Sequence, residues 1–279
     1  MDWSIFTHPS IQNAIIAGLC AGITCSAVGV FVVTMHLSFL GVCIAHAAFA
    51  GALFSILLGV DELIGALVFS LAAAAVIGPL ADRGELSPDA SIGIIFSFML
   101  GLAFLFLSLL PGSRTEALSL FWGSILSVRR LDLLYLIGVA AVVLIAIGLF
   151  FKEIQATLCH RQVALAVGIP TGVVFYGMLF ATGVTVAVSL PFIGGLLIYS
   201  LLLNPAAAAF QLTYSLKRMF ILAAVFGVAS CWMGLFASYL WDVGAGAAIV
   251  LTSTAIFAIA TALSPKRKMK KWKPTGITR

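Results

Sequence analysis

Cys43 and His46 lie three residues apart in the stretch FLGVCIAHAAFAG, residues 39–51, which is otherwise almost entirely apolar. Thiolate and neutral imidazole groups are both metal ligands, and residues three apart on a helix share one face. A soft ligand pair of this kind favours zinc, copper or nickel over manganese. In a symmetric dimer, two such pairs would place four ligands near one axis. The spacing therefore makes a metal site one hypothesis for this segment.

Both residues also have a purely structural interpretation. A lone cysteine in an apolar helix commonly fills space as a small hydrophobic residue. Ionisable side chains inside a bilayer are rare and face a protein interior or a pathway, so we expect His46 to line the path of a transported species. A transport site must also release its ion, so an incomplete ligand set is compatible with transport. Met35 and His36 either receive an exiting metal or simply sit at the membrane interface.

Composition identifies the surroundings of these residues as lipid. Of the 279 residues, 62% are hydrophobic and only 9% are charged, whereas soluble domains carry about 25% charged residues. A span needs about 20 apolar residues in helical form. The sequence therefore predicts an all-α, polytopic membrane helical bundle of eight to nine transmembrane helices. The predicted spans are 12–34, 39–58, 62–80, 89–110, 132–151, 172–190, a short broken element at 191–204 beginning at Pro191, 217–240 and 244–263.

Positive charge predicts the orientation of the bundle. With nine elements and the basic tail inside, twelve Lys and Arg residues fall on the inner side and three on the outer side. The N-terminus is then outside, and residues 12–34 form a first span rather than a cleaved signal peptide. We predict one transmembrane domain, 1–264, and a basic cytoplasmic tail, 265–279, suited to anionic membrane lipids and not to nucleic acid. The five scattered cysteines indicate no disulfide framework.

Two connecting segments are expected to be helical. The apolar part of residues 111–133 is too short to span and predicts an interfacial helix with Trp122 at headgroup depth. Residues 152–170 predict one amphipathic cytoplasmic helix ended by Gly168 and Pro170, which either docks on a soluble partner or lies in the interface. Asp89, with Ser87 and Pro88, is expected to cap a helix; Asp242 is expected to cap the last helix, and Pro205 to end one.

Six segments, in order, resemble the permease subunits of ABC importers for transition-metal ions such as zinc, manganese or iron. Each motif alone is weak, because Ala and Gly recur in membrane helices, but the ordered set covers about residues 12 to 263. The segments are LSFLGVCIAHAAFAG (37–51), SPDASIGIIFSFMLGLAFLF (87–106), LFWGSIL (120–126), HRQVALAVGIP (160–170), LPFIGGLLIYSLLLNPAAAA (190–209) and DVGAGAAIVL (242–251).

The resemblance implies a fold, partners and a coupling segment. It implies a type II ABC importer permease, forming a homodimer with two ATP-binding cassette subunits inside and a metal-binding receptor protein outside. It places the protein in the cytoplasmic membrane, the inner membrane where a cell has two. The metal ion would be the transported substrate, and no cofactor is expected. The residues implied to engage the ATPase are His160, Arg161, Ala164, Gly168, Ile169 and Pro170.

One departure from the family pattern affects the metal site. The family usually has Gly-Asp-x-x-x-His in the second helix, and here Gly41 is followed by Val42. The histidine is matched by His46, but its carboxylate partner four residues earlier is absent. We therefore predict that Cys43 replaces the missing carboxylate, with zinc favoured and manganese or iron as further candidates. The departure would equally suit a permease for a metal chelate.

Other functions fit the sequence less well. The chain contains no GxxxxGK[ST] phosphate loop, so we expect no enzyme activity of its own and ATP hydrolysis in a partner subunit. A gradient-driven secondary transporter or channel would need buried carboxylates for ion coupling, and the predicted span interiors contain none. An intramembrane enzyme would need paired catalytic groups, which a single histidine does not supply.

Overall fold

The computed structural model describes residues 9–83, 87–110, 118, 123 and 125–266. Within these residues, nine helices are long and apolar enough to cross a membrane, which confirms the predicted all-α bundle. Between and beside them lie the shorter helices η2 (Ile125–Ser127), α7 (Phe151–Cys159) and α8 (Arg161–Ala166). The nine long helices are α1 (Pro9–Thr34), α2 (Leu40–Leu58), α3 (Glu62–Arg83), α4 (Pro88–Leu109), α6 (Arg130–Leu149), α9 (Thr171–Ile193), α10 (Gly195–Leu212), α11 (Leu216–Trp241) and α12 (Ala245–Ala262).

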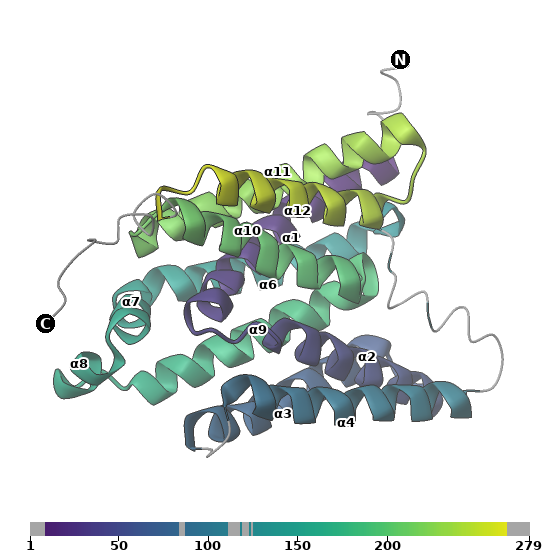
Figure 1. Cartoon of the computed structure of the whole chain (residues 1–279). Helices are drawn as coiled ribbons and strands as arrows, with labels where there is room; N and C mark the ends of the chain where they lie inside the picture. The colour runs from purple at the N-terminus through teal and green to yellow at the C-terminus, as the bar shows by residue number, and fades with distance from the viewer. Residues whose placement is uncertain (1–8, 84–86, 111–117, 119–122, 124, 267–279) are drawn as a thin grey trace, which may run out of the picture.

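The long helices run roughly along one direction, so the bundle has two distinct ends (Figure 1). Helix α1 begins at one end and α12 finishes at the other, as an odd number of spans requires. Helices α7 and α8 lie at the end where α12 finishes (Figure 1). This groups Lys152, Arg161 and the residues leading into the basic tail at one end, in agreement with the predicted orientation. Which side of the membrane this end faces stays a prediction.

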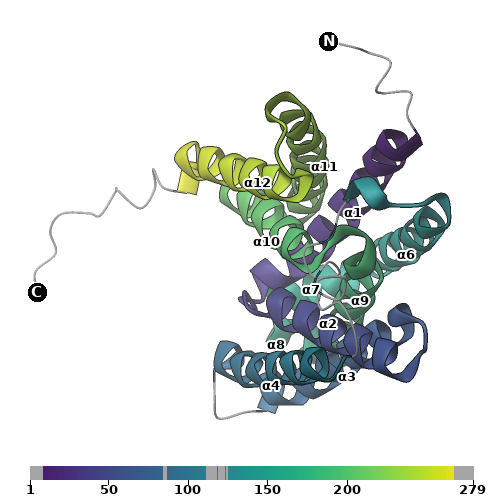
Figure 2. The same cartoon turned by 90° about the vertical axis from the view of Figure 1, so that its right-hand side faces the viewer.

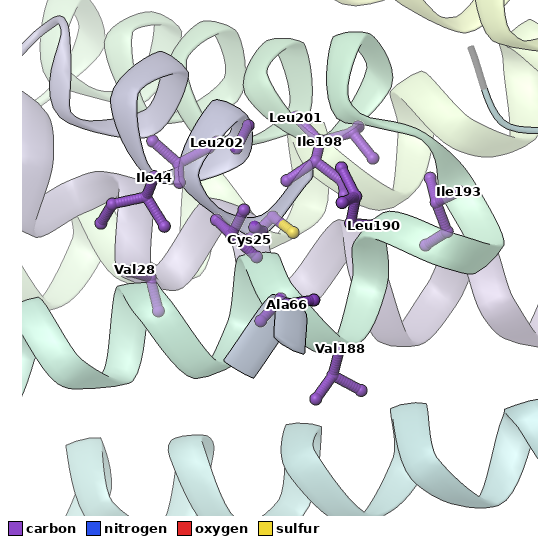
Figure 3. Close-up of a cluster of buried hydrophobic side chains, with 14 of the residues drawn as sticks. Cys25, Val28, Ile44, Ala66, Val188, Leu190, Ile193, Ile198, Leu201 and Leu202 are labelled. Carbon is purple, nitrogen blue, oxygen red and sulfur yellow. The ribbon is translucent and has the colours of Figure 1, made fainter. Parts of the chain in front are cut away.

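Helices α1 and α2 form the centre of the bundle together with α9 and α10. Helix α1 packs against α6, α9, α10 and α11, and α2 packs against α3, α4, α9 and α10 (Figure 2). The core between them is built from aliphatic side chains such as Val28, Ile44, Ile198 and Leu201, with Cys25 among them (Figure 3). The α1 and α2 spans are 72% buried, whereas those of α4 and α12 are 28% buried and leave apolar faces outward.

Glycines allow the central helices to approach at backbone distance. A Cβ placed on Gly65 of α3 would lie 2.1 Å from the carbonyl oxygen of Gly51 on α2. A Cβ on Gly29 of α1 would lie 1.8 Å from the carbonyl oxygen of Leu202 on α10. Membrane helices associate through such close contacts because lipid offers no hydrophobic force to drive them together. These positions therefore admit no side chain.

The seventh span differs from its prediction in both position and length. Pro191 does not start an element but lies inside α9, and the break falls at Gly194, whose φ of 92° suits glycine. Helix α10 then runs for 18 residues, long enough to span, and not the short element 191–204. Pro205 does not end this helix but lies within it.

Pro205 is tolerated inside α10 because another helix supplies a hydrogen-bond donor. Proline has no N–H, so the carbonyl four residues earlier, that of Leu201, loses its helical partner. Ser26 Oγ on α1 donates to the Leu201 carbonyl oxygen at 3.2 Å, and the contact is buried. Donation from a neighbouring helix is a known way to satisfy backbone freed by proline in a membrane helix.

The predicted caps were right for α4 and wrong for α12. Ser87 Oγ accepts from the Ala90 N–H at 3.3 Å, with Pro88 following and Asp89 in the first turn. Asp242 instead ends α11, in a left-handed conformation with φ 51°, and Gly244 precedes α12 without a side-chain cap. Most of residues 111–124, including Trp122, lie outside the described residues, and only the short η2 turn follows there.

Candidate functional site

Helix α2 begins within the bundle and not at its edge. After α1 ends, His36 turns the chain with a positive φ of 56°, a conformation in which histidine is over-represented. Leu37 and Leu40 are buried, and Gly41 lies directly beside Tyr199 on α10. Figure 1 shows the chain turning back after α1, so that α2 starts part-way along the bundle. His46, in the second turn of α2, is thereby held at an interior depth.

The His46 imidazole is fixed on two sides. Its Nδ1–H donates to the Val42 carbonyl oxygen at 2.9 Å; a carbonyl only accepts, so Nδ1 carries the proton of the neutral ring. Nε2 is then the nitrogen with metal-binding character. The ring also meets Phe96 of α4 edge-on, with centroids 4.9 Å apart and planes at 85°. Sequence reasoning missed Phe96, whose only signal was an aromatic residue in an apolar helix.

Cys43 and His46 differ in exposure although they are three residues apart. Val42 and His46, four apart, are both partly exposed, whereas Cys43 is completely buried. Within the residues that the structure describes, no three His, Cys, Asp or Glu side chains gather closely enough to hold a metal ion. One protomer thus offers a single imidazole at this point, and the role predicted for Cys43 stays a prediction. Met35 is half-buried and His36 exposed, so an exit role also stays a prediction.

The segment 152–170 forms two helices where one was predicted. Helix α7 ends at Cys159, and His160 takes an extended conformation with φ −149° and ψ 77° before α8 begins at Arg161. Helix α7 is amphipathic, with Ile154 and Thr157 buried. The predicted stop is present, and it ends α8.

Gly168 ends α8 in a Schellman motif. Its φ is 85°, and its N–H donates to the Leu165 carbonyl oxygen at 3.0 Å. The Ile169 N–H donates to the Ala164 carbonyl oxygen at 3.0 Å, which completes the pair of reversed bonds typical of this cap. Pro170 then leads directly into α9. The Gly-Ile-Pro sequence therefore fixes the direction in which α8 leaves the bundle.

Helix α8 is tied to α9 and leaves apolar side chains uncovered. The Arg161 guanidinium lies over the Phe175 ring of α9, 5.7 Å from its centroid, and Ala164 is buried. Val163, Leu165 and Val167 are 62%, 55% and 72% exposed. Val163 and Val167, four residues apart, share one side of α8, and Leu165 lies on the other side. Exposed apolar side chains on a short helix at the end of the bundle are typical of a docking surface for a partner or of a lipid interface.

A polar cluster between α10 and α12 was also missed by sequence reasoning. Asn204 Nδ2 donates to Ser253 Oγ at 2.9 Å and to Thr254 Oγ1 at 3.1 Å, and Ser200 Oγ lies 2.6 Å from Ser253 Oγ. Polar side chains commonly join membrane helices in this way. The available signal was the pair Ser200 and Asn204, four apart on one face of an apolar segment.

Comparison with known proteins places the whole chain in one group. Residues 7–264 match the ABC 3 transport family. The manganese import system permease protein ScaB of Streptococcus gordonii is 34% identical over 94% of both chains. The chelated iron transport system membrane protein YfeD of Yersinia pestis is 26% identical, over 98% of this chain and 92% of that protein.

A solved structure shows the same fold. PsaBC from Streptococcus pneumoniae, determined in complex with a Fab, contains a chain that superposes with a TM-score of 0.85. The two chains are 33% identical, and the match covers 96% of each.

Proposed function

The chain belongs to the ABC 3 transport family, and we propose that it imports manganese as the permease subunit of its transporter. It is a multi-pass membrane permease of a bacterial ABC metal importer, and the ATPase activity resides in a separate subunit. Such a permease works with ATPase and substrate-binding partners. We further propose the assembly of two permease copies, two ATPase subunits and one extracytoplasmic receptor.

The burial of Cys43 is the observation that favours manganese over zinc. A zinc preference was predicted from a thiolate–imidazole pair, and that pair needs both groups on the exposed face of α2. His46 is on that face beside Val42, whereas Cys43 points into the core. Without the thiolate, the site would hold one imidazole from each of two protomers, completed by water; the soft ligand that favoured zinc is lost, and water ligands suit manganese. The manganese permeases among the relatives support the same choice.

A metal chelate is the second candidate. The side chain at position 42 is Val, so this position supplies no carboxylate ligand beside His46, and an already ligated ion needs fewer ligands from the protein. The chelated iron relative supports this alternative. The two candidates differ in whether the free ion stimulates the transporter.

The coupling role of α8 rests on its exposed apolar side chains and on the Schellman cap that ends it. We propose that Val163 and Val167 on one side of α8 dock into a groove of the ATPase, with Leu165 on the other side facing the membrane interface, and that Arg161 and Gly168 transmit the movement to α9. His160, Ile169 and Pro170 complete the turn on either side. This surface accounts for apolar side chains that would otherwise face water.

The test is metal-dependent ATPase stimulation of the reconstituted complex with its receptor. We expect stimulation by Mn²⁺, loss of it in His46→Ala, and normal activity in Cys43→Ser. Cys231→Ser is the matched control, because Cys231 is an equally buried cysteine on α11. If Zn²⁺ stimulates the ATPase and this stimulation is lost in Cys43→Ser but not in Cys231→Ser, zinc and not manganese is the transported metal. Stimulation only by a ferric chelate would favour the second candidate.

A further inference from the structure

A large apolar cavity opens at the end of the bundle where α1 begins, away from His46. It encloses about 1200 Å³ between the ends of α1, α10, α11 and α12. Small-molecule sites usually measure about 300–1,000 Å³, so this space exceeds a packing defect. Figure 2 views the bundle from this end. Its lining includes Ile15, Trp232, Leu235, Tyr239, Asp242 and Gly246.

The cavity has the depth of one membrane leaflet. Its outer limit is Asp242, where α11 ends, and its inner limit on the same helix is Trp232. Ten residues of helix rise about 15 Å. The hydrocarbon core of a bilayer is about 30 Å thick, so one leaflet contributes about half of that. The length of the cavity therefore equals the depth of the acyl chains in a single leaflet.

The polarity of the lining changes along that depth. Ile15 and Leu235 form the deep wall, and the indole Nε1–H of Trp232 donates to the Ile15 carbonyl oxygen at 3.3 Å. Near the mouth, Ser238 Oγ donates to the Val243 carbonyl oxygen at 2.6 Å. The Trp232 N–H and the Ser238 O–H therefore both donate to backbone carbonyls of the protein, and neither is directed at a ligand in the cavity.

Charge at the mouth is negative. Among the described lining residues, Asp242 is the single charged one, and it is exposed. Tyr239 lies one turn below it on α11. Aromatic rings and a carboxylate together attract an ammonium group, and tyrosine is commonly found at headgroup depth.

We propose that this cavity binds a phosphatidylethanolamine molecule of the leaflet on the side where α1 begins. One acyl chain fills the space between α1, α11 and α12, and the ammonium headgroup faces Asp242. A lipid is the occupant that fits best, because the cavity is as long as one leaflet is deep, its wall is apolar and its mouth is acidic. The site is separate from His46 and from α8, so it does not rest on the proposed metal specificity.

Photo-crosslinking in lipid nanodiscs tests this site. The probe is phosphatidylethanolamine with a diazirine near the end of one acyl chain, and labelled peptides are mapped by mass spectrometry. We expect labels to concentrate around Ile15, Trp232 and Leu235. Gly246→Phe should abolish them, because a Cβ at Gly246 meets no heavy atom within 4 Å and the ring can enter the cavity. Gly138→Phe on α6 is the matched control, since Gly138 also has open space and lies outside the cavity.

A competition experiment tests the headgroup. Unlabelled phosphatidylethanolamine should displace the probe and anionic phosphatidylglycerol should not. Asp242→Asn should remove that difference, and Asp61→Asn, which alters another exposed acid at the same end, should keep it. Labels spread evenly over α4 and α6, or undiminished labelling in Gly246→Phe, would overturn the lipid site. Cross-linking of Ala247→Cys to a second permease copy would show that a protein fills the cavity instead.

Discussion

Ser26 on α1 donates a hydrogen bond to the Leu201 carbonyl oxygen on α10, the carbonyl that Pro205 leaves without its helical partner. The serine and the proline therefore act on the same atom from two helices. Because the contact is buried, water cannot replace the hydroxyl. The pair explains how α10 passes through a proline and still spans the bundle.

The Ser26–Pro205 relationship predicts a non-additive pair of substitutions. Ser26→Ala should lower the free energy of unfolding by about 0.6–1.7 kcal/mol, the range for hydrogen bonds between membrane helices. In a Pro205→Ala background the restored N–H satisfies Leu201, so the same change should cost much less. A double-mutant cycle by denaturant unfolding in detergent checks this. Equal costs in both backgrounds would contradict the shared role.

The contact between Gly51 and Gly65 predicts a sharp contrast between glycines. Gly65→Ala should prevent stable folding, because the new Cβ would lie 2.1 Å from the Gly51 carbonyl oxygen. Gly101→Ala on α4, where a Cβ meets open space, should be neutral or stabilising by up to about 1 kcal/mol. Monodispersity after heating in detergent distinguishes the two. Normal melting of Gly65→Ala would show that α2 and α3 can separate at no cost.

The edge-on contact with Phe96 predicts a positioning role toward His46. Phe96→Leu should raise the metal concentration for half-maximal uptake by about two- to tenfold, since such ring pairs contribute about 0.5–1.5 kcal/mol. The maximal rate should change little, because the imidazole remains present. Phe98→Leu, on the exposed face of the same helix, is the control. A fall in maximal rate with unchanged half-saturation would argue against positioning.

Val42→Asp should restore the carboxylate typical of the family. Val42 is partly exposed and four residues before His46, so an aspartate there would face the same ion. We expect half-saturation by Mn²⁺ at about tenfold lower concentration, equivalent to ~1.4 kcal/mol, with slower release. Uptake measured across Mn²⁺ concentrations tests this, with Val60→Asp, exposed in the connection between α2 and α3, as the control. If binding is unchanged, position 42 does not face the ion.

The Schellman cap of α8 predicts that coupling depends on Gly168. Gly168→Val should uncouple ATP hydrolysis from uptake, because a β-branched residue is strained at φ 85° and α8 would leave at a different angle. Gly172→Val in the first turn of α9, where a Cβ has open space and φ is helical, should remain coupled. The readout is metal imported per ATP hydrolysed. An unchanged ratio in Gly168→Val would remove α8 from the coupling role.

The sequence predicted the spans well because each needs only length and apolar composition. It misplaced the seventh because Pro191 and Pro205 were taken as breaks. Proline is tolerated in a membrane helix when a neighbour satisfies the freed carbonyl, and that neighbour is 175 residues away in the sequence. The helix breaks at Gly194 instead, and the local sequence does not predict that this glycine adopts a positive φ.

The site was predicted only in part for a similar reason. His46 was predicted as a site residue because an ionisable side chain is rare in an apolar segment. The structure adds its contact with Phe96 on α4. The pairing with Cys43 followed from spacing on one helix, but burial depends on the helices packed around α2. The residues of the α8 cap were implied by family resemblance, whereas the hydrogen bonds that form the cap are seen only in the folded structure.

The glycine contacts between α2 and α3 also bear on how this protein can change over evolutionary time. Backbone atoms meet at this seam, and side chains such as Phe54 and Phe69 pack across the same two helices, where replacements of similar size can keep the contact. The two glycines have no such freedom, since every replacement adds at least one carbon. A lineage that altered its transported metal would therefore revise positions such as Val42 while inheriting the seam unchanged.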